Sequence, residues 1–412
     1  MPEIGCFKFK NRNPIEPTIC TDVMNKLIIF FFIFFFPTTL YAEKILVNYA
    51  GFSYLGKYES QLSGMPLTTQ LTKEKKNNQN IVDYAITNKL KKTNPKNFNI
   101  SFDLADLEKG NTIVMSVGIS KEIFSEEYNS YTKAYNNSIG LFLQIYFYDF
   151  REKKLIAAVP IYGEVNFISE VKADNNLKLK NLRDFYEDQL IGENEEKIGI
   201  AQKIKEVIEN FELKEKYRNR IGITKVDIEE RAKSEIPKNI NLDELKNETA
   251  QSFSSKLSLY QGVSIVPFIE GVVIGGTMKA SFVQSSEIYD IILPAPDFFI
   301  ELGISNFKKS LAKTSDISDI WQYGSAINIK IYQPDLNKVY LNDRLIRITN
   351  IKRAKGTEIY HWSKFYYNNQ ILLDELALNI SKQDRNWILV VSKKKEFADQ
   401  LNEVNKLLEK VR

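Results

Sequence analysis

Apolar positions recur along this chain with two periods, one of two residues and one of three to four. The runs 139–150 and 154–163 are apolar and β-rich, and the short charged segment 151–153 between them predicts a hairpin. Residues 139–150 are apolar on both faces, which is typical of a central strand. Other strands are predicted at 44–50, 112–117, 221–228, 262–268, 282–293, 298–304, 326–332, 339–348 and 387–391.

Helices are predicted where apolar residues recur every three or four positions. The clearest internal helix has a continuous stripe formed by Ile200, Ile204, Val207, Ile208 and Phe211. The chain closes on a second amphipathic helix, 394–411, with a narrow seam formed by Phe397, Leu401, Val404, Leu408 and Val411. This seam either packs on the protein's own sheet or binds another chain. Further helices are predicted at 81–92, 242–259 and 372–378, a loop at 66–80 and a linker at 171–179.

Together these elements predict an α+β or mixed α/β fold of two sheet-plus-helix modules. The first module is expected over residues 43–236 and includes a helical linker. A polar stretch around Pro237 marks the boundary. The second module is expected over residues 237–412 and ends in the amphipathic helix.

The two halves also share landmarks that suggest a diverged internal duplication. Each has a strand that ends in Gly-Ile-Ser, beginning at Gly118 and Gly303, and then a hairpin whose turn begins at Asp149 or Asp335. The spacings of 185 and 186 residues are nearly constant, as expected for a repeated unit. In element order each half resembles periplasmic domains such as the amino-terminal domain of TolB and the curli secretion channel. The match is topological, and the turn after Asp149 lacks the Thr-Gly usual in those domains.

An export signal is predicted at residues 24–42. Lys26 precedes ten apolar residues, Pro37 breaks the run, and small or neutral residues lead to Ala42. Ten residues of helix span roughly 15 Å, about half of a hydrocarbon core. Cleavage after Ala42 is therefore favoured over a retained anchor or a buried core strand, and the product would be periplasmic or secreted.

The segment before this signal does not fit it. A signal normally begins with a positive region, whereas residues 1–23 carry three acidic residues. We therefore interpret Met24 as the initiator and residues 1–23 as a misassigned upstream region. Both cysteines, Cys6 and Cys20, precede the signal, so the exported product would contain no thiol. That excludes disulfide bonds, cysteine catalysis and thiolate metal sites from the product.

The charge composition does not alter the prediction of an ordinary exported globular protein. Residues 43–412 carry 52 basic and 49 acidic residues, a net charge of +3, and the two signs are interspersed as on an ordinary soluble surface. Neither a basic stripe nor an arginine-rich helix is present, so we expect no nucleic-acid partner. Lysine greatly outnumbers arginine, which is typical of proteins from AT-rich bacterial genomes.

Candidate chemistry is sparse. The chain has one histidine, His361, and any Ser-His-Asp mechanism would depend on it. A zinc site needs three or four ligands, and the glycines of 271–276 match no phosphate-binding loop, so we expect neither metal nor cofactor. Those glycines lie among β-branched residues, which favours a bent or bulged strand over an exposed apolar hairpin.

An enzymatic alternative is a secreted hydrolase that uses paired carboxylates. The separation of such a pair is spatial rather than sequential, so the sequence does not select the members. The candidates at strand ends are Glu164, Glu270, Asp290 and Asp297.

The favoured interpretation is a non-enzymatic cell-envelope protein with a binding or assembly role and an unknown protein partner. The expected interaction surface consists of an aromatic cluster and the terminal seam, namely Tyr360, His361, Trp362, Phe365, Tyr366, Tyr367, Phe397, Leu401, Val404 and Leu408. A third interpretation is a membrane-associated component of an envelope assembly. In that case residues 262–278 or an uncleaved signal would contact lipid.

Overall fold

The computed structural model describes residues 44–56, 64–103, 112–129, 132–188, 198–214, 219–285, 287–355 and 361–412. The upstream region 1–23, the predicted signal at 24–42 and Tyr360 lie outside the described residues. From Ile45 to Arg412 the chain forms one unit, in which helices pack on two β-sheets. The mixed α/β fold expected from the sequence is confirmed.

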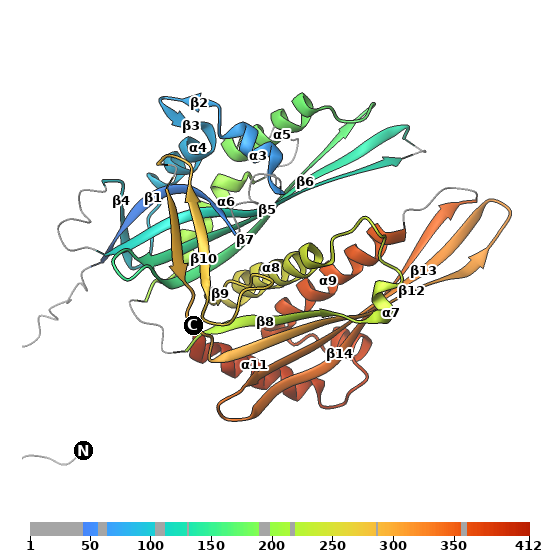
Figure 1. Ribbon diagram of the computed structural model, residues 1–412. Helices are drawn as coiled ribbons and strands as arrows, with labels where there is room; N and C mark the ends of the chain where they lie inside the picture. Colours follow the sequence, from blue (N-terminus) through green and yellow to red (C-terminus); the bar gives the residue numbers. More distant parts are fainter. Residues whose placement is uncertain are drawn as a thin grey trace, which may run out of the picture. The chain divides into compact units, whose positions relative to one another are not determined.

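The first sheet is built from β1 (Ile45–Leu55), β4 (Phe98–Ser101), β5 (Ile113–Asn129), β6 (Ala134–Asp149) and β7 (Lys154–Ser169). These strands lie in the order β7-β6-β5-β1-β4, with β1 parallel to β4 and β5, and with β5, β6 and β7 antiparallel (Figure 1). The predicted hairpin of β6 and β7 is confirmed. A separate two-stranded hairpin is formed by β2 (Lys75–Lys76) and β3 (Gln79–Asn80).

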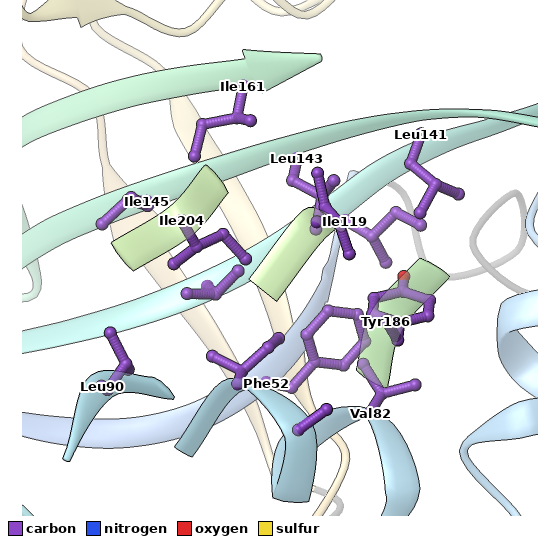
Figure 2. Close-up of a cluster of buried hydrophobic side chains, with 14 of the residues drawn as sticks. Phe52, Val82, Leu90, Ile119, Leu141, Leu143, Ile145, Ile161, Tyr186 and Ile204 are labelled. Carbon is purple, nitrogen blue, oxygen red and sulfur yellow. The ribbon is translucent and has the colours of Figure 1, made fainter. Parts of the chain in front are cut away.

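Four helices provide the core for one face of this sheet: α3 (Pro66–Leu71), α4 (Ile81–Leu90), α5 (Asn175–Glu187) and α6 (Ile200–Asn210). Figure 2 shows side chains of the strands and of α4, α5 and α6 pointing toward one another. Phe52 of β1 and Ile119 of β5 are completely buried there, as is Ile204 from the stripe of α6. The apolar stripe read from the sequence is therefore the face that α6 buries.

The opposite face is covered by a hairpin from the second half of the chain. Strand β10 (Thr277–Phe282) pairs antiparallel with β1, and β11 (Ile288–Ile292) pairs with β10 and, at one position, with β7. The strands β1, β5, β6, β7, β11 and β10 therefore form a closed ring. Its core contains Tyr146, Leu155 and Ile291. Gln284, in the hairpin turn, donates a hydrogen bond to the buried Asp83 of α4.

The second sheet is built from β8 (Ile221–Ile228), β9 (Ile265–Val266), β12 (Phe298–Thr314), β13 (Ser318–Gln333) and β14 (Lys338–Ala354), in the order β14-β13-β12-β8-β9. Its helices are α7 (Glu230–Lys233), α8 (Leu242–Gln261), α9 (His361–Lys382), α10 (Arg385–Val391) and α11 (Phe397–Val411). Helix α8 contacts α9 and strand β8 of its own half and also strand β7 of the first sheet (Figure 1).

The two sheets have the same connectivity and share two β-bulges. In each half the first strand is parallel to a neighbour and contains a bulge. In β1 the bulge follows the residue that pairs with Met115, and in β8 it follows the residue that pairs with Ile300. Met115 and Ile300 are 185 positions apart. A second bulge interrupts β5 at Ser120 and β12 at Ser305. Each serine Oγ donates to a carbonyl of the next strand, at 3.1 Å in β5 and 3.2 Å in β12. The Gly-Ile-Ser motif therefore marks an equivalent bulge, and common ancestry of the halves stays a prediction.

The second predicted landmark, the aspartate at the hairpin turn, does not occupy equivalent positions in the two halves. The turn after β6 occupies residues 150–153 and the turn after β13 occupies 334–337, with Lys153 (φ 52°) and Asn337 (φ 46°) in the left-handed region. Asp149 is the last strand residue and caps its turn by accepting from the backbone N–H groups of residues 151 and 152. Asp335 lies inside its turn, so the two aspartates are not equivalent.

Other element predictions fail for identifiable reasons. Residues 387–391, predicted as a strand, belong to helix α10, because Asp384 accepts hydrogen bonds from the first backbone N–H groups and a short apolar run alone does not distinguish helix from strand. Residues 271–276 form a loop rather than a bulged strand, with Gly271 (φ 78°) and Gly275 (φ 80°) in the left-handed region. The predicted strand 282–293 is interrupted by the turn between β10 and β11. The predicted loop 66–80 contains α3 and the β2–β3 hairpin.

Candidate functional site

A cavity of about 500 Å³ lies where the first sheet meets helix α8. Strands β5, β6 and β7 contribute Lys121, Phe142 and Pro160, and the segment after β9 contributes Phe268. The first turns of α8 contribute several polar side chains, which begin immediately after the N-cap residue Asn241. This volume lies within the range of small-molecule sites.

The polar wall is organised around Lys121. Its Nζ lies 2.7 Å from Oε2 of Glu244 and 3.7 Å from Oε1 of Glu248, two residues one helical turn apart on α8. Lys121 follows the bulged residue Ser120, and a bulge redirects the side chains next to it. The bulge of β5 thus places Lys121 against two carboxylates.

Glu248 has an unusual environment for a carboxyl group. Its side chain is 15% exposed, and burial raises its pKa from 4.5 to about 7. The Lys121 ammonium opposes this shift, the charge of Glu244 adds to it, and a hydrogen bond from Tyr366 opposes it. Burial and the negative charges of Glu248 and Glu164 raise the pKa of the Tyr366 phenol, so this hydroxyl is a donor at neutral pH.

Taken as a whole, the lining is acidic above an apolar floor. Among the lining residues that the structure describes, the carboxylates of Asp243, Glu244, Glu248 and Glu270 are accompanied by one ammonium group, that of Lys121. Lys246, outside the lining, lies 3.2 Å from Asp243 and 3.0 Å from Glu270. Apolar surface comes from Phe142, Pro160, Phe268 and Met278. This combination suits a group that carries positive charge on an apolar body.

A second cavity, of about 690 Å³, lies along the same junction of β7 and α8 and has the opposite charge. Its basic residues are Lys203, Lys214, Lys256 and Arg412, against acidic Glu206 and Glu212. Two of these cations have close partners: Lys203 donates to the Tyr162 carbonyl at 2.6 Å, and Lys256 lies 2.9 Å from Asp374. Burial and the nearby Lys256 lower the pKa of Lys203.

The residues expected to form an interaction surface lie mostly inside the protein. Trp362 is 8% exposed and Phe365 is fully buried in the core between α9 and the second sheet, whereas Tyr367 is 63% exposed. His361 is half-buried, with Nδ1 2.9 Å from the Tyr323 hydroxyl, and burial lowers its pKa. Tyr366 is half-buried and contacts the Glu248 carboxyl.

The seam of the terminal helix also lies in the core. Phe397, Leu401, Val404 and Leu408 are completely buried, and α11 packs on β14 and α9. In the described structure the terminal helix therefore packs on its own sheet, which is one of the two alternatives considered for this seam. Its apolar side chains are not exposed to a partner.

The four candidate hydrolytic carboxylates have separate environments. Glu164 accepts from Tyr162 at 2.8 Å and from Ser138, and Glu270 pairs with Lys246. Asp290 lies 3.0 Å from Lys279, and Asp297 accepts from the backbone N–H of residue 220. In the parts of the chain that the structure describes, no three His, Cys, Asp or Glu side chains are grouped as metal ligands would be.

Sequence reasoning named Glu270 as a candidate carboxylate but missed the other charged residues of the acidic cavity. Lys121 and Glu248 are 127 positions apart and belong to different halves of the chain, so no local pattern connects them. The one available signal was the spacing of Glu244 and Glu248, which places both carboxylates on one face of a helix. In the described chain, none of the helices has the length and hydropathy of a membrane span.

Comparisons with known proteins give weak similarity. No protein-family model and no curated protein matches the chain. Among solved structures, a minor lipoprotein from Acinetobacter baumannii is 10% identical, covers 43% of this chain and 98% of its own, and has a TM-score of 0.21. A DUF330 protein from Xanthomonas campestris is 10% identical, covers 40% of this chain and 87% of its own, and has a TM-score of 0.21.

A third solved structure is described as a neuraminyllactose-binding hemagglutinin homologue from Helicobacter pylori. It is 11% identical, covers 46% of this chain and 91% of its own, and has a TM-score of 0.24. Similarities at this level do not define a family for the chain.

Proposed function

We propose that this is an exported cell-envelope protein with a binding role, and that it binds its ligand or partner segment in the acidic cavity. The bound group would carry positive charge on an apolar body. The observation that supports this most is the position of Glu248, whose carboxylate is 15% exposed and lies 3.7 Å from Lys121 Nζ in the wall of a cavity of about 500 Å³.

Ionising the Glu248 carboxyl costs free energy in this environment. Burial disfavours its charged form, and Lys121 compensates only in part because Glu244 lies closer to the same ammonium group. A second cation entering the cavity would stabilise the carboxylate by as much as about 4 kcal/mol at 4 Å, if the effective dielectric constant is about 20. Binding would then favour the deprotonated form of Glu248.

The apolar floor adds a second requirement. Phe142, Phe268 and Met278 present apolar surface that an inorganic cation would not use. A ligand that covered this surface would gain about 25 cal/mol for each Å² removed from water. An amine with an aromatic or aliphatic body, or a basic side chain of a protein partner, satisfies both requirements.

The location follows from the predicted signal at residues 24–42. It is tested by fractionating the native cells and sequencing the N-terminus of the recovered protein. We expect the chain to begin at Glu43 and to be found outside the cytosol. A cytosolic protein that retains residues 24–42 would contradict the export part of the proposal.

Binding is tested with two probes that share a ring and differ in charge, tryptamine and indole-3-acetate. We expect calorimetry to detect binding of tryptamine and not of indole-3-acetate. Glu248→Gln removes a close carboxylate and should weaken tryptamine binding by about fivefold to tenfold. The control is Glu403→Gln, which neutralises an exposed carboxylate on α11 and should leave the affinity unchanged.

Two results would contradict the binding site. One is equal affinity for both probes, which would mean that charge does not select the ligand. The other is tryptamine binding that Glu248→Gln and Glu403→Gln affect equally, which would place the probe outside the acidic cavity.

A further inference from the structure

Helix α10 presents apolar side chains to solvent. Leu389 is 78% exposed and Val390 is 80% exposed, although they lie between Ile388 and Val391, which are 9% and 4% exposed. Exposed apolar residues are ordinary when scattered, but an adjacent pair on one short helix is a local apolar surface.

The orientation of α10 is fixed by contacts on its inner side. Asp384 accepts from the backbone N–H of Trp387, and the Trp387 indole donates to Glu375 at 2.9 Å. Ile388 and Val391 belong to the core of the second half. Turning the helix to bury Leu389 would break these contacts, so the apolar pair stays outside.

Exposed basic residues flank this pair on both sides in the sequence. The exposed cations from the end of α9 to the start of α11 are Lys382, Arg385, Lys393, Lys394 and Lys395. The acidic residues in this segment are Asp384, which caps α10, and Glu396, so the net charge of residues 382–396 is +3. Leu389 and Val390 together with these five cations are called the α10 patch.

A second exposed apolar pair provides a contrast. Ile168 is 74% exposed and Val171 is 72% exposed, near the end of β7. The charged residues of 164–174 are Glu164, Glu170, Lys172 and Asp174, which give a net charge of −2. The two pairs are similar in exposure and differ in the charge around them, so they form a natural comparison.

We propose that the α10 patch docks on an anionic lipid surface. Apolar side chains at the headgroup boundary, with a ring of cations for anionic headgroups, are the features of interfacial membrane binding. A second copy of this chain is a poorer occupant, because a symmetric contact would bring two sets of like charges together. The proposal goes beyond ligand binding in the acidic cavity and does not depend on it.

The test uses a fluorescent probe at Asn386, an exposed residue of α10, so that the signal reports this surface alone. Asn386→Cys is labelled with an environment-sensitive dye in a full chain in which Cys6 and Cys20 are replaced by serine. The matched control carries the dye at Ile168→Cys. Each protein is titrated with vesicles of phosphatidylcholine alone and of phosphatidylcholine with phosphatidylglycerol in equal parts.

We expect a blue shift at Asn386→Cys with the anionic vesicles only, and no shift at Ile168→Cys. Lys393→Gln and Lys395→Gln should each weaken the interaction about fivefold. Replacing Lys75 and Lys92, two exposed lysines outside the patch, by glutamine should have no such effect. Leu389→Ser with Val390→Ser should weaken it about tenfold.

Three results would overturn the proposal. A constant emission at Asn386→Cys with both vesicles would show that the patch does not contact lipid. An equal shift with both vesicles would show that the cations play no part. A shift without vesicles that grows with protein concentration would identify a second copy as the occupant.

Discussion

Glu248→Gln should change how the stability of this protein depends on pH. The carboxyl has a pKa of about 7 in the folded protein and an ordinary value of 4.5 when exposed. Between these two values the folded state retains a proton that the unfolded state has lost, so stability falls as pH rises. Below 4.5 and above about 7 both states carry the same charge, and the contribution is constant.

The size of the effect follows from the pKa difference. Each unit is about 1.4 kcal/mol, so wild-type protein should lose about 3 kcal/mol between pH 4.5 and pH 7 through this group. Glutamine cannot ionise, so the variant should gain about that amount relative to wild type over the same interval. Lys121 keeps its 2.7 Å contact with Glu244, which limits unrelated losses.

The assay is denaturant unfolding of both proteins over a pH series that crosses these values, and the measured quantity is the difference between variant and wild type. Glu170→Gln is the control, since it removes an exposed carboxylate that lies outside the acidic cavity. Its difference from wild type should change little with pH. A Glu248→Gln difference that stayed constant from pH 4.5 to pH 7, or that fell, would refute the assigned burial.

Other predictions concern packing and binding. Gly118→Ala should destabilise by about 1–3 kcal/mol, because the added methyl would lie 2.5 Å from the Leu55 side chain. Gly303→Ala, at the matching position of the second sheet, has ordinary 3.4 Å clearance and should change stability by less than about 1 kcal/mol, and thermal unfolding of both variants checks this difference. Leu401→Ala in the buried seam should cost about 2–5 kcal/mol, whereas Leu389→Ala on exposed α10 should cost less than about 0.5 kcal/mol, measured by denaturant unfolding. Tryptamine affinity should rise as pH increases through about 7, because the cation favours the ionised carboxyl, and an affinity that was flat or falling in calorimetry would contradict this linkage.

The spacing of apolar residues correctly predicted the helices that bury one apolar face. The stripe from Ile200 to Ile208 and the seam of α11 are each buried as their spacing indicates. The pattern failed at residues 387–391, where two apolar side chains point inward and two point outward, so neither period is visible. It also failed at 271–276, where left-handed glycines build a loop among β-branched neighbours.

The acidic cavity was beyond sequence reasoning for a different reason. Its charged wall joins β5 to α8, and its apolar floor includes residues from β6, β7 and the segment after β9. Only the closure of the first sheet against α8 brings them together. The two Gly-Ile-Ser motifs did carry usable information, because each marks a bulge at the same place in its sheet.

The strands β1, β5, β6 and β7 cannot close the ring of the first sheet without β10 and β11. Strands β1 and β7 pair with a hairpin that is synthesised more than a hundred residues after β7 ends. Until then residues 53–55 of β1 and Lys154 of β7 lack these strand partners, and the buried rings of Tyr146 and Tyr148 lack the hairpin side chains that pack on them. A nascent or truncated chain that stops before Thr277 would leave these strand positions and this apolar surface uncovered and prone to aggregation.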